Sequence, residues 1–113
     1  GEKQKVLMLR ALINDPDILI LDEPATGLDI GAREDFLDSL KNIMNGRSHS
    51  LIYVTHHVEE ITPLFSRIFV LDDGKCFFNG LIEEAITENI FSTLFKRNIE
   101  VFRRNGRFYS SLE

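Results

Sequence analysis

The chain has 113 residues, of which 43% are hydrophobic and 27% are charged, and its formal net charge is -5. That length and hydrophobic content allow one domain, or most of one, with a buried core. The acidic balance excludes a generally basic surface of the kind that binds nucleic acid or anionic lipid. The single cysteine, Cys76, cannot form an internal disulfide, which fits a reducing compartment. No apolar run approaches the roughly 18 residues of a membrane span, so a membrane role would require a partner.

The first part of the chain predicts a helix, a turn and a strand. Apolar residues recur at helical spacing from Gly1 to Ile13, without an internal glycine or proline, which favours a helix with one buried face. Asn14-Asp15-Pro16 then predicts a turn. The short apolar run from Ile18 to Leu21 does not alternate, which is typical of a strand covered on both faces in a parallel sheet.

A second helix and a second strand are predicted next. From Ile30 to Met44 the apolar residues fall on one helical stripe, and Asp29 is placed to cap its first turn. Leu51 to Thr55 predicts a second buried strand. The residues after it predict a short helix that begins near His57 and that Pro63 kinks or stops, whereas His49 is expected in a loop.

The rest of the chain predicts a further strand, two hairpins and two short helices. Arg67 to Leu71 predicts a third strand, which the alternation of strands and helices assigns to the same parallel sheet. Asp73-Gly74 predicts a turn into a fourth strand, Lys75 to Asn79. Residues 81–86 and 88–95 predict short helices. A terminal hairpin is predicted to fold about Asn105-Gly106, a pair that tolerates positive φ angles.

Acidic and imidazole side chains follow two of the predicted strands. Asp22 and Glu23 come directly after the first strand, and His56 comes directly after the second. Because ligands of open α/β sheets bind beyond the carboxyl ends of the strands, these side chains are expected to converge on one site if the strands are neighbours.

This set of residue types fits hydrolysis of a nucleoside triphosphate. One carboxylate can hold Mg²⁺, which prefers oxygen ligands, and the other can orient or deprotonate the attacking water. A histidine can donate a hydrogen bond to a phosphoryl oxygen that gains charge. The alternative interpretation is a strand end whose acids face solvent or cap a turn.

Three segments support the catalytic interpretation by their resemblance to a known family. ILILDEPATGLD, from Ile18 to Asp29, resembles the Walker B segment and D-loop of ABC-type ATPases. VTHHVEE resembles their switch-histidine segment, and GEKQKVLMLRAL resembles the end of their signature motif. The resemblance covers about residues 1–80, in the order and spacing of the second half of an ABC nucleotide-binding domain. It implies the C-terminal half of a P-loop NTPase-type α/β domain, with a parallel sheet and flanking helices.

The resemblance implies a role for each matching residue. Asp22 corresponds to the acid associated with Mg²⁺, and Glu23 to the catalytic base for water. His56 corresponds to the switch residue that contacts the γ-phosphate of ATP and helps to hold Glu23. Asp29, in the D-loop, implies communication across a head-to-tail dimer. Gly1 corresponds to the last signature glycine, which contacts the nucleotide bound to the opposite subunit.

The sequence departs from the family pattern because it lacks the phosphate-binding motif. No G-x-x-x-x-G-K-[ST] motif occurs in the 113 residues, so the phosphate-binding loop is missing. We therefore expect residues 1–96 to be the C-terminal half of an ABC ATPase domain and residues 97–113 to be a hairpin extension. The full domain is expected to hydrolyse ATP, and the chain alone to be inactive.

The resemblance implies a cytoplasmic ATPase subunit at the inner face of the membrane, paired with a second such subunit and energising a separate permease. A soluble ABC-type ATPase that acts on nucleic acid or ribosomes is one alternative, and a non-catalytic interaction fragment is another. Arg103, Arg104 and Arg107 alternate with aromatic residues in the tail, a pattern that can bind single strands. We favour a hairpin with one face packed on the domain over nucleic-acid binding.

Overall fold

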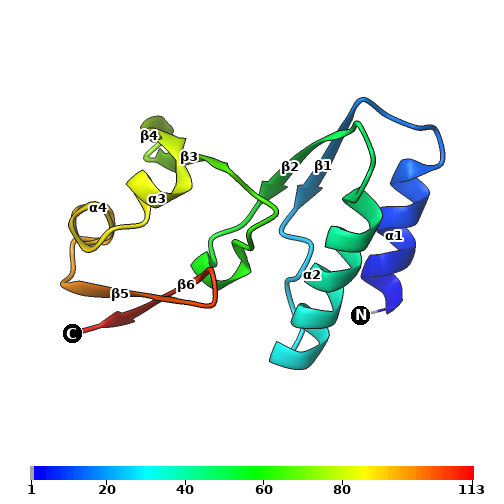
Figure 1. Cartoon of the computed structure of the whole chain (residues 1–113). Coiled ribbons are helices and arrows are strands. Elements are labelled where there is room, and N and C mark those ends of the chain that lie inside the picture. The colour runs from blue at the N-terminus through cyan, green and yellow to red at the C-terminus, as the bar shows by residue number, and fades with distance from the viewer. Residues whose placement is uncertain (1) are drawn as a thin grey trace. The chain divides into compact units, whose positions relative to one another are not determined.

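The computed structural model describes residues 2–113 (Figure 1). These residues form two compact units, with the boundary between His56 and His57. Within the described residues the strands form three two-stranded sheets, one in the first unit and two in the second. No helix of residues 2–113 is long and apolar enough to span a bilayer. The assignment of residues 97–113 to a separate extension stays a prediction.

The first unit consists of two helices and a pair of parallel strands. Its elements in chain order are α1 (Glu2–Leu12), β1 (Ile18–Asp22), α2 (Ile30–Met44) and β2 (Ser50–Val54). The strands pair in parallel from Ile18 opposite Ser50 to Asp22 opposite Val54. Parallel neighbours need a crossover between them, and α2 supplies it. The two helices and two strands predicted for this region are confirmed.

The core of the first unit lies between the helices and one face of the strand pair. Phe36 and Leu40 of α2 are fully buried, and Met8 of α1 is 1% exposed. Leu19 is the buried residue of β1, and α1 contacts both α2 and β1. The apolar stripe predicted for α2 therefore packs inward, which confirms the helix periodicity.

The predictions that β1 is covered on both faces and that β2 is a buried strand are wrong for the described residues. Ile18 and Ile20 are 54% and 63% exposed, and Ile52 and Val54 of β2 are 48% and 44% exposed. Successive side chains of a strand point to opposite faces, so these residues share the face away from Leu19. An apolar run shows that a strand avoids water, but α1 and α2, the helices of this unit, cover one face of the strand pair.

Replacing Phe36 by alanine tests this core. Loss of a fully buried phenylalanine is expected to lower the free energy of unfolding by about 3–5 kcal/mol, because it removes buried area and leaves a cavity. Urea denaturation followed by circular dichroism measures the change. Phe69→Ala is the matched control, because Phe69 is 58% exposed and its loss is expected to cost about 0.5 kcal/mol or less. Equal losses for the two variants would contradict the assigned core.

The second unit combines short helices with two hairpins. Its elements are η1 (Val58–Glu60), β3 (Arg67–Asp72), β4 (Lys75–Leu81), α3 (Ile82–Ala85), α4 (Glu88–Phe95), β5 (Ile99–Arg104) and β6 (Arg107–Leu112). Both hairpins turn through residues with positive φ, at Asp73-Gly74 and at Asn105-Gly106. The predicted hairpin turns and the two short helices are confirmed. The short helix predicted after His57 is a single 3₁₀ turn.

The assignment of the third strand to the parallel sheet is not what the described residues show. β3 pairs antiparallel with β4, and the parallel sheet contains β1 and β2. The tight turn at Asp73-Gly74 brings β4 back beside β3, so the local pairing costs little chain entropy. Alternation of strands and helices along the sequence therefore did not identify the partner of β3.

The terminal hairpin packs one face on the core of the second unit. Ile99 and Phe108 belong to a buried apolar cluster. The other members of this cluster are Val58, Ile82, Ile86 and Phe91. The Arg107 guanidinium donates a hydrogen bond to the Glu59 carbonyl. Phe102 and Tyr109, paired across the hairpin, lie on its other face and are 48% and 40% exposed. The predicted packing of one hairpin face is thus observed.

Candidate functional site

The first component of the site is Glu23, which directly follows β1. Its backbone N–H donates to the Val54 carbonyl at 2.8 Å, so the chain is still held to β2 where it leaves the strand. The φ angle of Glu23 is +48°, in the left-handed region that a non-glycine residue enters at a cost. Such backbone strain clusters at functional sites. Glu23 thus places a carboxylate just past the carboxyl end of β1.

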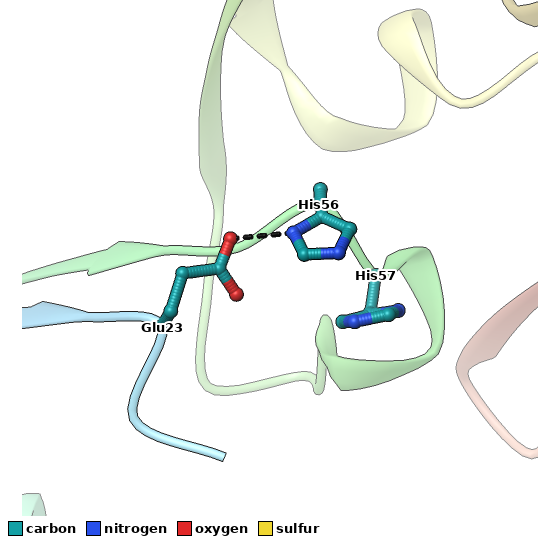
Figure 2. A group of neighbouring side chains, drawn as sticks. All are labelled: Glu23, His56 and His57. Atoms are coloured by element: carbon teal, nitrogen blue, oxygen red, sulfur yellow. Dashed lines mark hydrogen bonds and ion pairs between the residues drawn. The ribbon is translucent and has the colours of Figure 1, made fainter. Parts of the chain in front are cut away.

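The second component is His56, which follows the last residues of β2. Its Nδ1 lies 2.6 Å from Oε1 of Glu23, although the two residues are 33 positions apart (Figure 2). Parallel register places the carboxyl ends of β1 and β2 at the same edge, which explains the meeting. The predicted convergence of Glu23 and His56 is present in the structure, whereas their catalytic roles stay predictions.

The pair is open to solvent on the imidazole side. The His56 side chain is 72% exposed, and that of Glu23 is 31% exposed. Oε2 of Glu23 is buried and accepts no hydrogen bond from any residue within 2–113. A buried carboxylate oxygen costs free energy unless it gains a partner. Oε2 is therefore suited to accept a hydrogen bond from a water molecule or to bind a cation.

Asp22 lies beside this pair as the last residue of β1. It is paired with Val54 across the strands and is exposed. By strand alternation its side chain shares the exposed face of Ile18 and Ile20. Carboxylate oxygens are the ligands that Mg²⁺ prefers, and the ion keeps several of its waters. Asp22 therefore has the chemistry to hold Mg²⁺ at the carboxyl edge of the strands, and its role as the metal ligand stays a prediction.

The other two predicted site residues have different outcomes. Oδ1 of Asp29 accepts a hydrogen bond from the Ala32 N–H at 2.7 Å, which makes Asp29 the N-cap of α2. The predicted capping role is therefore confirmed, and a role in dimer communication stays a prediction. Gly1 lies outside the described residues.

Curated relatives decide the family. The chain is 47% identical over 108 residues to YlmA of Bacillus subtilis, an uncharacterized ABC transporter ATP-binding protein, and the match covers 95% of this chain and 41% of YlmA. It is 39% identical over 85 residues to the molybdenum import ATP-binding protein ModC of Pectobacterium atrosepticum, covering 75% of this chain and 24% of ModC. The chain belongs to the ABC-type ATP-binding proteins.

The matched region is one part of an ABC-type protein, because the chain spans about two fifths of YlmA. No protein-family model matches the chain. A solved structure described as an inward-facing conformation of a metal-chelate type ABC transporter has the same fold over the whole chain. The TM-score is 0.80 at 18% identity, and the match covers 45% of that structure's chain. The predicted fold class, a half domain of the α/β P-loop NTPase type, is thereby confirmed.

Proposed function

We propose that the chain supplies the hydrolytic residues of an ABC-type ATPase subunit that energises transport through a separate membrane permease. The observation that carries this proposal is the 2.6 Å contact between Glu23 and His56 at the carboxyl ends of two parallel strands. The names of the curated relatives, which include an import ATP-binding protein, support the assignment to transport.

Glu23 is the residue that acts on the attacking water. Its Oε1 is engaged by His56, so the proton acceptor is the buried Oε2. When a hydrogen bond holds one oxygen of a carboxylate, the direction of the other oxygen is fixed as well. Correct orientation of the reacting groups contributes much of the rate enhancement in phosphoryl transfer. Asp22 would hold Mg²⁺ directly or through water, and the ion would supply positive charge that offsets the charge of the phosphate oxygens.

His56 has two tasks in this proposal. Because a carboxylate oxygen can only accept, Nδ1 of His56 donates to Glu23. Donation from Nε2 to a phosphoryl oxygen then requires protons on both ring nitrogens. Such an imidazolium holds Glu23 in place and offsets the charge that develops on the transferred phosphoryl group.

The remaining assignments concern the assembly. Asp29 caps α2 and, in the D-loop position, communicates with a second ATPase subunit in a head-to-tail dimer. Gly1 contacts the nucleotide of that second subunit. The dimer lies at the cytoplasmic face of the membrane, where the permease binds it. Nucleic acid is not a partner in this proposal.

The 113-residue chain alone is expected to bind ATP very weakly or not at all. Backbone N–H groups and the lysine of a phosphate-binding loop supply most of the phosphate affinity in P-loop NTPases, and the sequence contains no such loop. Equilibrium titration with a fluorescent ATP analogue measures the affinity. Micromolar affinity of the isolated chain would contradict this prediction.

A chimera tests the function itself. In it the chain replaces the matched segment of YlmA, so that the remaining three fifths come from the relative. We expect the chimera to bind ATP and to release phosphate in the presence of Mg²⁺. Intact YlmA, assayed in parallel, is the reference. A folded chimera that binds ATP but does not hydrolyse it, beside an active YlmA, would overturn the proposal.

A further inference from the structure

His49, in the segment between α2 and β2, has a nearly buried side chain in the first unit. The side chain is 6% exposed, and its Nδ1 contacts the carbonyl oxygen of Pro16. Its Nε2 lies 3.1 Å from Oδ1 of Asp15. The imidazole therefore joins the entrance of β2 to the turn that precedes β1, two segments that are 33 positions apart.

The contact with Pro16 requires His49 to act as a donor. A backbone carbonyl accepts hydrogen bonds and does not donate them, so Nδ1 of His49 carries the N–H that faces the Pro16 oxygen. The Asp15 side chain is 87% exposed, and an ion pair with an exposed carboxylate contributes little. The contact with the Pro16 carbonyl is part-buried, so we assign to it the larger contribution to the stability of the strand pair.

The His49–Pro16 contact lies at the start of the parallel strand pair. Directly after it, Ser50 N–H donates to the Asp17 carbonyl at 2.8 Å, and the parallel register runs on to Asp22 opposite Val54. A two-stranded pair is only marginally stable by itself, and a slip of one residue reverses the face of every side chain. The Glu23–His56 hydrogen bond lies at the opposite end of the same pair.

We infer that His49 is a positioning residue for the Glu23–His56 pair. Its ring holds the entrances of β1 and β2 in one register, and that register aligns His56 with Glu23 at the carboxyl ends. The link to catalysis rests on the proposed ATPase function, whereas the structural link from His49 to His56 does not. A nitrogen donor at position 49 is the required chemical feature.

Two variants distinguish the effect of the hydrogen-bond donor at position 49 from the effect of the volume of the ring. His49→Leu introduces an apolar side chain of similar bulk that has no donor, whereas His49→Gln retains an N–H donor for the Pro16 carbonyl. Asp15→Asn removes the exposed carboxylate alone. Leu37→Ala is the matched control, because it weakens the core of the same unit at a residue of α2 that is 4% exposed.

The readout is the imidazole ¹H–¹⁵N spectrum of the 113-residue chain, in which Nδ1–H of His56 reports its hydrogen bond to Glu23. We expect His49→Leu to shift this resonance and to speed the solvent exchange of its proton at least tenfold. His49→Gln and Asp15→Asn are expected to keep the signal near its wild-type position. Leu37→Ala is expected to lower the stability without moving the signal.

An unchanged His56 signal in folded His49→Leu would overturn the inference, and so would an equal shift in Leu37→Ala. If the His49→Leu chain does not fold, the same variants are measured in the YlmA chimera. There His49→Leu is expected to lower kcat about tenfold with KM for ATP within twofold, and His49→Gln to restore kcat. An equal loss with glutamine would also overturn it. An inactive chimera with an intact His49–His56 link would refute the ATPase function alone.

Discussion

Glu23→Gln in the YlmA chimera is expected to abolish steady ATP turnover while ATP binding persists. The amide has nearly the same shape as the carboxylate, but it cannot accept the proton of the attacking water. The loss of a general base at this position is expected to lower kcat about 10²–10⁴-fold. Phosphate release measures turnover, and binding of a fluorescent ATP analogue measures affinity. With hydrolysis blocked, the ATP-bound dimer is expected to accumulate, which size-exclusion chromatography detects.

The matched control for this substitution is Glu84→Gln, in α3. Glu84 is exposed and lies in the second unit, so the same loss of charge there is expected to leave kcat within twofold of wild type. Hydrolysis retained by Glu23→Gln would refute the assignment of Glu23 as the residue that acts on water. A parallel loss in Glu84→Gln would show that the assay responds to net charge.

His56→Ala is expected to lower kcat about 10²–10³-fold. The substitution removes the hydrogen bond that orients Glu23, and it removes the proposed donor to the phosphoryl oxygen. Because His56 is 72% exposed, little stability is lost, and the melting temperature is expected to change by only a few degrees. Single-turnover phosphate release separates the chemical step from ATP binding.

A neighbouring histidine provides the control for His56→Ala. His57 is the N-cap residue of η1 in the second unit, and its Nδ1 lies 3.6 Å from Oε1 of Glu59. His57→Gln is expected to lower kcat less than His56→Ala does. If Glu23 and His56 act as one unit, the double variant is expected to lose little more than Glu23→Gln alone. Fully additive losses would contradict the proposed coupling.

Local patterns in the sequence were sufficient for the helices and the hairpins. The helical stripe of residues 30–44 and the cap at Asp29 determine α2, because side-chain periodicity and backbone capping act within a few residues. Asp73-Gly74 and Asn105-Gly106 determine their turns, because those residues tolerate positive φ angles. The strings ILILDEPATGLD and VTHHVEE also indicated the meeting of Glu23 with His56, through their resemblance to one family.

Other features depended on which segments come together in space. The pairing of β3 with β4, and the exposure of Ile18 and Ile20 on β1, were not predicted. The sequence placed His49 in a loop and gave no sign of its burial, although the acidic turn around Asp15 is the kind of partner that a histidine uses. Periodicity reports how apolar a segment is, but not which segment covers it.

The sequence by itself determined the elements of this protein, its family and the residue types at the candidate site. Only the tertiary structure decided that the carboxylate of Glu23 and the imidazole of His56 share a hydrogen bond, and that His49 holds the other end of the same strands. The physical reason is that helices, caps and tight turns form from contacts within a few residues. Strand register and side-chain burial depend on contacts between residues that are 33 positions apart.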